Sequence, residues 1–236
     1  MSPITLPLES QDATLDVVGG KGASLAKMAL AGLPVPNGFL ITTTAYHQFA
    51  AEIDKSIDPN DLKVVFEETD INDELRDAIV QAYQVLGEDQ PVAVRSSATA
   101  EDLPESSFAG QQDTFLNVRG AVAVVDAVRK CWASLWNERA IAYRKKMGIE
   151  EEGIGMGVVV QEMVEADTSG ILFTANPVSG DRTQVVVNAS YGLGESVVSG
   201  QVTPDTYIVD RGKLQVVEST IGEKTQMLLS TAGQGI

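Results

Sequence analysis

The sequence predicts an α+β (α/β) protein with two lobes, the first over residues 1–163 and a smaller, strand-rich one over residues 164–236. Apolar residues recur at helical spacing through much of the first 150 positions. From about residue 157 onward, short apolar runs alternate with glycine-containing turns, which is typical of strands joined by hairpins. With 236 residues, 44% of them hydrophobic, the chain can bury a core of this size.

Composition excludes several classes of function. The formal charge of −16 argues against a DNA or RNA partner, because phosphate-backbone binders carry a basic face. The single cysteine, Cys131, excludes a disulfide within the chain and fits a reducing compartment. The first residues lack the pattern of a signal peptide, and no stretch approaches the ~18 apolar residues of a membrane span. We therefore expect a cytoplasmic protein without nucleic-acid or membrane partners.

The first candidate site is the glycine-rich segment from Leu15 to Gly32. We expect a short strand that runs into Gly19-Gly20-Lys21-Gly22 and a helix that begins near Ala23. Such a loop presents backbone N–H groups and a lysine to phosphate. It is not a Walker A loop, since Gly22 rather than Ser or Thr follows the lysine. For this segment alone, a flexible turn with a solvated lysine remains the alternative.

The next segments supply scaffold. A buried strand is expected over Phe39–Thr42, an amphipathic helix from about Thr44, and a second helix over Asp73–Leu86. The one histidine, His47, lies on the first of these helices beside Tyr46 and is expected to be structural. Any chemistry that passes through a dedicated histidine would then need another polypeptide segment.

The central stretch from Val92 to Val118 is the strongest local signal. An apolar strand ends at Arg95, a run of small and acidic residues follows, the chain turns near Gly110, and a second strand covers Thr114–Val118. Small residues let the backbone approach a ligand, while N–H groups and one guanidinium donate to an anion. A polar hairpin loop with a surface arginine is the alternative.

After this stretch we expect one long helix, Ala121 to Met147, with Cys131 as a small core residue. The basic run Arg144-Lys145-Lys146 is interpreted as cations that match the negative end of the helix.

The strand predicted over Gly157–Val164 ends in a polar pair, Gln161 and Glu162, that needs hydrogen-bond partners. A ligand edge such as a purine would provide them, and so would an ordinary core edge. The remaining elements are listed in chain order: strands at Gly170–Ala175 and Thr183–Ser190, a glycine loop at Tyr191–Gly200, and a hairpin of Thr206–Asp210 with Lys213–Glu218.

Taken together, the chain resembles the N-terminal nucleotide-binding domain of the phosphoenolpyruvate synthase and pyruvate phosphate dikinase family. The matching segments are VGGKGASL, GLPVPNGFLIT, VAVRSSATAEDLPESSFAGQQDTFLNV, ASLWNERAIAYR, VVVQEMV, GILFTANPVSG and YGLGESVVSG with TPD. They run in family order from about residue 15 onward.

The resemblance implies an ATP-grasp fold that holds ATP and Mg²⁺ and passes phosphoryl groups to a histidine on a separate domain. It implies catalytic roles for Lys21 and Arg95 at the phosphates. The full set of residues that it implies for ATP binding is Lys21, Arg95, Gly110, Thr114, Gln161, Glu162, Met163 and Val164. Gly110 and Thr114 would belong to a loop over the phosphates, and the last four residues would flank adenine.

The loop sequence SFAGQQDT favours the phosphoenolpyruvate synthase (pyruvate, water dikinase) branch or the related rifamycin phosphotransferases. Segments like DIEWA, QARP and TSHAA, which in the family supply the magnesium carboxylate, an arginine and the phosphohistidine, are absent from this sequence. We therefore assign no metal ligand and expect a partial second lobe. The chain alone should not complete a dikinase reaction, and a non-catalytic nucleotide-binding remnant is the alternative.

Overall fold

A computed structural model describes residues 3–54, 56–99, 113–147 and 154–230. These residues divide into two compact units, one ending at Met163 and the other beginning at Val164. Both contain an antiparallel sheet, so the α+β class predicted from the sequence is confirmed.

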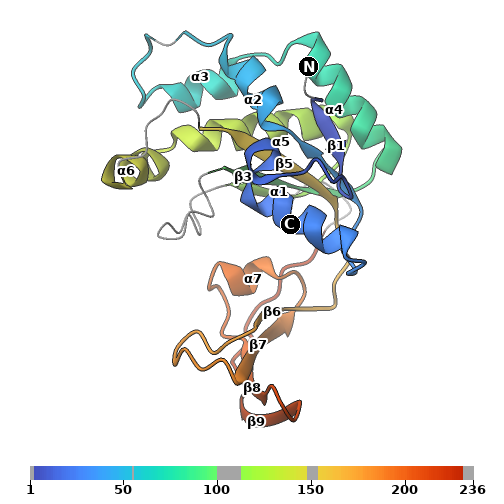
Figure 1. The fold of residues 1–236 in the computed structure, drawn as a ribbon, viewed down its shortest axis with the longest axis vertical. Coiled ribbons are helices and arrows are strands. Elements are labelled where there is room, and N and C mark those ends of the chain that lie inside the picture. Colours follow the sequence, from blue (N-terminus) through green and yellow to red (C-terminus); the bar gives the residue numbers. More distant parts are fainter. Residues whose placement is uncertain (1–2, 55, 100–112, 148–153, 231–236) are drawn as a thin grey trace. The chain divides into compact units, whose positions relative to one another are not determined.

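The first unit is built on a five-stranded sheet in the order β1-β2-β5-β3-β4 (Figure 1). The strands are β1 Thr5–Pro7, β2 Gly38–Ile41, β3 Val92–Ala98, β4 Thr114–Val118 and β5 Met156–Glu162. All four pairings are antiparallel. β5 lies between β2 and β3, and every one of its residues up to Gln161 is buried. A central strand buried on both faces explains the continuous apolar run of VVV in the sequence.

Helices cover both faces of this sheet. They are α1 Leu15–Leu30, α2 Thr43–Ala50, α3 Leu62–Glu68, α4 Asp73–Leu86, α5 Ala121–Ala133 and α6 Glu138–Met147. The larger core joins α2–α5 to one face through aromatic residues such as Phe49, Phe66 and Trp132. The smaller core joins α1 to the other face through Val18, Leu40 and Val159.

Two predicted elements are wrong. Leu15–Val18 is a helical turn rather than a strand, and α1 is kinked at Gly19, whose φ of 73° and ψ of 173° are not helical. The long helix expected over Ala121–Met147 is broken after α5 by a short 3₁₀ turn, Ser134–Trp136. Asn137 is extended there and its side chain accepts from Ala140 N at 2.7 Å, so it begins α6 as a new N-cap.

The basic run at the end of α6 also differs from expectation. Arg144 is buried, with 3% of its surface exposed, and donates to the carbonyl of Leu135 while its guanidinium lies over the ring of Trp136. Lys145 and Lys146 are exposed. Arg144 is therefore a structural residue of the helix junction, and only the two lysines fit the predicted solvated helix end.

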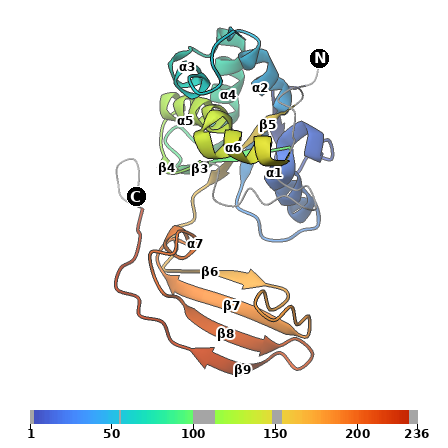
Figure 2. The same cartoon turned by 90° about the vertical axis from the view of Figure 1, so that its left-hand side faces the viewer.

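The second unit is a four-stranded antiparallel sheet whose strands follow chain order: β6 Thr168–Phe173, β7 Gln184–Tyr191, β8 Asp205–Asp210 and β9 Gln215–Thr220 (Figure 2). A short helix, α7 Glu195–Val198, follows β7. Among the described residues of this unit, the buried hydrophobic side chains are Val186, Leu193 and Val202. The predicted strands and hairpin are confirmed, but the apolar core of this unit is small.

Within the described ranges, no helix is both long and apolar enough to cross a membrane.

Candidate functional site

Three of the predicted site residues lie on one face of the first sheet. Arg95 of β3 is directly opposite Thr114 of β4 and Val159 of β5, and Ala93 is opposite Gln161. Opposed residues of an antiparallel pair point to the same side, as do alternate residues of one strand. Since Val159 packs in the core beneath α1, Arg95, Thr114 and Gln161 share the face that α1 covers.

Lys21 reaches the same face from α1. Its Nζ donates to the backbone oxygen of Ser96 at 2.8 Å, so the ammonium group lies beside the residue that follows Arg95. Two further bonds fasten this turn of α1 to β3: Gly22 N donates to Ser97 Oγ at 2.9 Å, and Ser97 Oγ donates to Val18 O at 2.8 Å. The lysine and the arginine are thus held near one another by two consecutive serines.

Glycine makes this close approach possible. A Cβ at Gly19 would lie 1.9 Å from Ser97 O, and a Cβ at Gly157 would lie 2.4 Å from Val18 O. Both contacts are with backbone atoms, which cannot move aside as a flexible side chain can. The α1 turn therefore packs directly on the backbones of β3 and β5. The positive φ at Gly19 changes the direction of the chain there, and the helical segment that contains Lys21 follows.

The loop between β3 and β4 is described only at its ends. Asp113 O accepts from Ser96 N at 3.3 Å and from Ser96 Oγ at 3.0 Å, which fixes the start of β4 beside Arg95. Thr114 is exposed and Arg95 is partly buried. Gly110, the predicted turn of this loop, lies outside the described residues.

The last residue of β5 and the residue after it are held from both sides through their backbone N–H groups. Glu162 N donates to Asn37 O at 2.8 Å, and Met163 N donates to Pro91 O at 2.9 Å. The buried side chain of Gln161 donates through Nε2 to Pro36 O at 3.1 Å. Val164 is 56% exposed. The side chain of Gln161 therefore finds a protein partner, as expected for a polar residue at a core edge, and the turn that leads into β2 provides it.

Ser96, Ser97 and the turn Pro34–Gly38 are site-building residues that sequence reasoning missed. A signal was available for the serines, because two hydroxyls inside a buried strand need partners. The hydroxyl of Ser96 donates to Asp113 O, whereas that of Ser97 accepts from Gly22 N of α1, 75 positions away in the sequence, which no local pattern indicates.

The single histidine and the single cysteine stay in structural roles. The ring of His47 is edge-on to that of Tyr46 with 5.4 Å between centroids, and partial burial lowers the pKa of His47. Burial raises the pKa of the Cys131 thiol strongly, Asp113 adds to this, and Lys21 opposes it. Among the described residues, no group of three or more His, Cys, Asp or Glu side chains could hold a metal ion.

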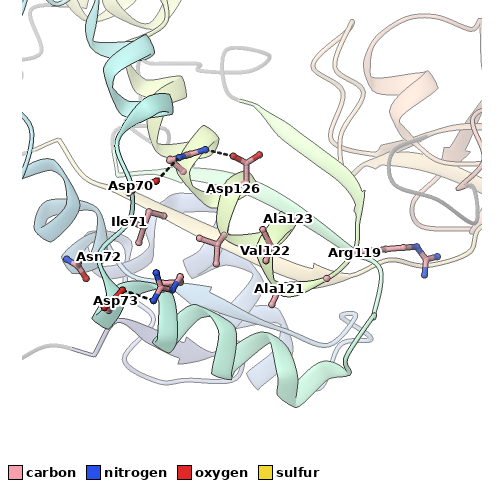
Figure 3. Close-up of a pocket in the computed structure, with 13 residues that line it drawn as sticks. Asp70, Ile71, Asn72, Asp73, Arg119, Ala121, Val122, Ala123 and Asp126 are labelled. Carbon is pink, nitrogen blue, oxygen red and sulfur yellow. Dashed lines mark hydrogen bonds and ion pairs between the residues drawn. The ribbon is translucent and has the colours of Figure 1, made fainter.

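A hollow of about 940 Å³ lies elsewhere in the first unit, along α4 and α5 (Figure 3). Its three arginines face acidic neighbours: Arg129 pairs with Asp126 and Asp70, Arg76 pairs with Asp73, and Arg119 lies 3.8 Å from Asp89. These helices cover the face of the sheet opposite to Arg95. The hollow is therefore separate from the candidate site, and its cations are already engaged.

The first unit is thus an α+β domain with a lysine and an arginine on one face of its sheet, beside a helical segment that packs on the sheet through glycines. The chain belongs to the family described as pyruvate phosphate dikinase, AMP/ATP-binding domain, whose model matches residues 15–235. This confirms the resemblance predicted from the sequence.

Curated relatives agree. The chain is 43% identical over 244 residues to a protein of Methanothermobacter thermautotrophicus named probable phosphoenolpyruvate synthase, covering 93% of this chain and 36% of the relative. It is 40% identical over 275 residues to phosphoenolpyruvate synthase of Pyrococcus furiosus, covering 93% and 34%. It is 43% identical over 242 residues to phosphoenolpyruvate synthase of Aeropyrum pernix, and this match covers 91% of this chain and 29% of the relative. The chain thus spans about a third of these relatives' length.

Proposed function

We propose that this chain is the ATP-binding portion of a phosphoenolpyruvate synthase-like phosphotransferase and that it has an ATP-grasp fold. The observation that carries the proposal is the shared face of the first sheet, where Arg95, Thr114 and Gln161 lie and which Lys21 reaches from α1. The family match supports ATP as the ligand. The names of the relatives support phosphoenolpyruvate synthesis, rather than rifamycin modification, as the activity of the whole protein.

Lys21 and Arg95 would bind the phosphates. Lysine supplies a compact point charge, and arginine supplies a planar fork of donors that matches phosphate oxygens. The helical segment after Gly19 adds the positive end of its dipole beside Lys21. Phosphoryl transfer depends mainly on positioning and on stabilising charge as the group moves, so these two cations have the chemistry that the reaction requires. Thr114, opposite Arg95, would contribute a hydroxyl to the same site, with Gly110 in the loop before it.

Adenine would lie against the segment that begins at Gln161. The N–H groups of Glu162 and Met163 are bonded to Asn37 O and Pro91 O. Contacts to the base would then fall to the carbonyl of Glu162 and the N–H of Val164, with Met163 flanking the ring. A carbonyl acceptor and an N–H donor match the amino group and the neighbouring ring nitrogen of adenine, and they mismatch the corresponding edge of guanine.

Among the described residues, no group of three or more acidic, histidine or cysteine side chains could hold a metal ion. No step is assigned to the ion here. Transfer onto a histidine and then onto pyruvate would require residues of the longer protein, since His47 stands on α2 among structural neighbours. We expect this chain alone to bind ATP without completing the dikinase reaction.

Isothermal titration of the purified chain with ATP tests the proposal. Arg95→Ala and Lys21→Ala should each weaken binding by roughly 10- to 100-fold, which is the loss expected for a charge-assisted hydrogen bond of about 1.5–3 kcal/mol. The matched control is Lys145→Ala, because that side chain is exposed on α6. In thermal unfolding, ATP at 100 times its Kd should stabilise the wild type by about 2.7 kcal/mol. Failure of the wild type to bind ATP, or wild-type affinity in Arg95→Ala, would overturn the proposal.

A further inference from the structure

The turn Pro34–Gly38 follows α1 in the chain. It precedes β2, and it makes two of the hydrogen bonds that hold the end of β5: Glu162 N to Asn37 O at 2.8 Å and Gln161 Nε2 to Pro36 O at 3.1 Å. Gln161 is separated from Pro36 by 125 positions in the sequence. A turn and a strand end that are distant in the chain are therefore joined at the segment to which the base is assigned.

The turn has its own internal support. Asn37 Oδ1 accepts from Gly38 N at 2.9 Å, so the side chain of an exposed residue closes the turn onto its own backbone. Gly38 lies so near β5 that a Cβ there would be 2.2 Å from Val160 O and 2.9 Å from the Cα of Gln161. The backbone of the turn thus packs against that of β5 over three consecutive residues, Val160 to Glu162.

On the other side, Pro91 accepts from Met163 N at 2.9 Å. Pro91 and Pro36 cannot donate a backbone hydrogen bond, because proline has no N–H. Pro91 and Pro36 therefore contact this segment only as acceptors, through their carbonyl oxygens. Neither proline can donate a backbone hydrogen bond to a carbonyl of residues 161–163. The carbonyl of Met163, which faces Pro91, therefore receives no ladder hydrogen bond from that residue.

We propose that the turn Pro34–Gly38 positions the base-binding segment, and that Gln161 acts through this turn as a positioning residue rather than by donating to the base. The inference rests on the proposed function. Its chemical reason is that the buried amide of Gln161 directs one of its two N–H groups to Pro36 O, while a shift of the turn would displace the Glu162 carbonyl that is assigned to adenine. A displaced carbonyl weakens recognition of the base and leaves the phosphate contacts of Lys21 and Arg95 intact.

The test distinguishes recognition of the base from binding of the phosphates. Affinities for ATP, GTP and inorganic tripolyphosphate are measured for the wild type, Gln161→Met and Asn37→Ala. Methionine keeps the volume of glutamine and removes the donor to Pro36 O. We expect each variant to bind ATP about tenfold more weakly, to lose preference for ATP over GTP by a similar factor, and to bind tripolyphosphate within about twofold of the wild type.

Asn37→Asp is the matched control, because aspartate keeps the acceptor for Gly38 N and should retain the wild-type preference for ATP over GTP. Asn37 is exposed, so neither of its variants threatens the core. Unchanged preference for ATP in both Gln161→Met and Asn37→Ala would overturn the inference, and so would an equal loss for ATP and tripolyphosphate. A wild type that binds no ATP would overturn the proposed function. A wild type that binds ATP, with unchanged preference for ATP in both variants, would overturn this inference alone.

Discussion

Gly19 and Ser97 are in such close contact that a single added carbon at Gly19 would lie 1.9 Å from the carbonyl oxygen of Ser97. The contact joins the kink of α1 to the end of β3, and it holds Lys21 beside Arg95. Two separate penalties therefore act on any substitution at Gly19: the strain of a positive φ and the collision with a neighbouring backbone.

Gly19→Ala should lower the free energy of unfolding by about 3 kcal/mol or more, as measured by urea denaturation, because both penalties apply. The chain contains its own control. Gly32 has almost the same φ of 74°, but a Cβ there would meet nothing within 4 Å. Gly32→Ala should cost only the left-handed strain of about 1–2 kcal/mol. Equal costs for the two substitutions would show that the contact with Ser97 is not tight.

Arg144→Ala should destabilise the protein by about 2–4 kcal/mol. The substitution removes the bond to Leu135 O and the cation–π contact with Trp136, and it leaves a cavity beside a partly buried ring. Lys145→Ala, one residue along α6 and exposed, should change stability by less than about 0.5 kcal/mol. Chemical denaturation of both variants checks the pair, and indistinguishable midpoints would contradict the structural role of Arg144.

Cys131 should make stability depend on pH in alkaline solution. Burial is the main cause that raises the pKa of its thiol in the folded protein, whereas in the unfolded chain the pKa is about 8.5. The unfolded state then releases a proton that the folded state keeps. The contribution of this thiol to the free energy of unfolding is thus fully present below about pH 8.5, and it falls by about 1.4 kcal/mol for each pH unit above that value.

The comparison variant for this effect is Cys131→Ala, since Tyr and Lys side chains also titrate in the same range. The difference in unfolding free energy between wild type and variant should narrow from pH 8 to pH 10. A difference that stays constant across this range would show that the thiol ionises equally in both states.

Local patterns predicted most elements of the first unit. The helix Asp73–Leu86 and the strand Thr114–Val118 have the predicted bounds, because an amphipathic stripe and a β-rich run are each set by neighbouring residues. The break at Ser134–Asn137 was missed because apolar residues continue through it at helical spacing. What ends α5 is local hydrogen bonding: Ser134 Oγ donates to Cys131 O, and Asn137 caps the next helix.

The candidate site was predictable in residue type and only partly in arrangement. A lysine after two glycines and an arginine in a buried strand are visible in the sequence, and their role in binding ATP stays a prediction. Their proximity depends on α1 packing on β3 through Ser97, and the fixed end of β5 depends on the turn at Asn37. Such contacts between distant segments arise from the tertiary fold, so periodicity and turn propensity carry no information about them.

The first sheet lies between two apolar cores, whereas the described part of the second unit buries few apolar side chains. The two sheets should therefore differ in the rate at which their backbone amides exchange with solvent. Amides of β3 and β5 lie between two apolar layers, so their exchange with solvent should require unfolding of the whole first unit. In β9 every residue is exposed, and the described part of its sheet buries few apolar side chains. Deuterium should therefore enter β8 and β9 through small, frequent openings, orders of magnitude sooner than it reaches the strand that carries Arg95.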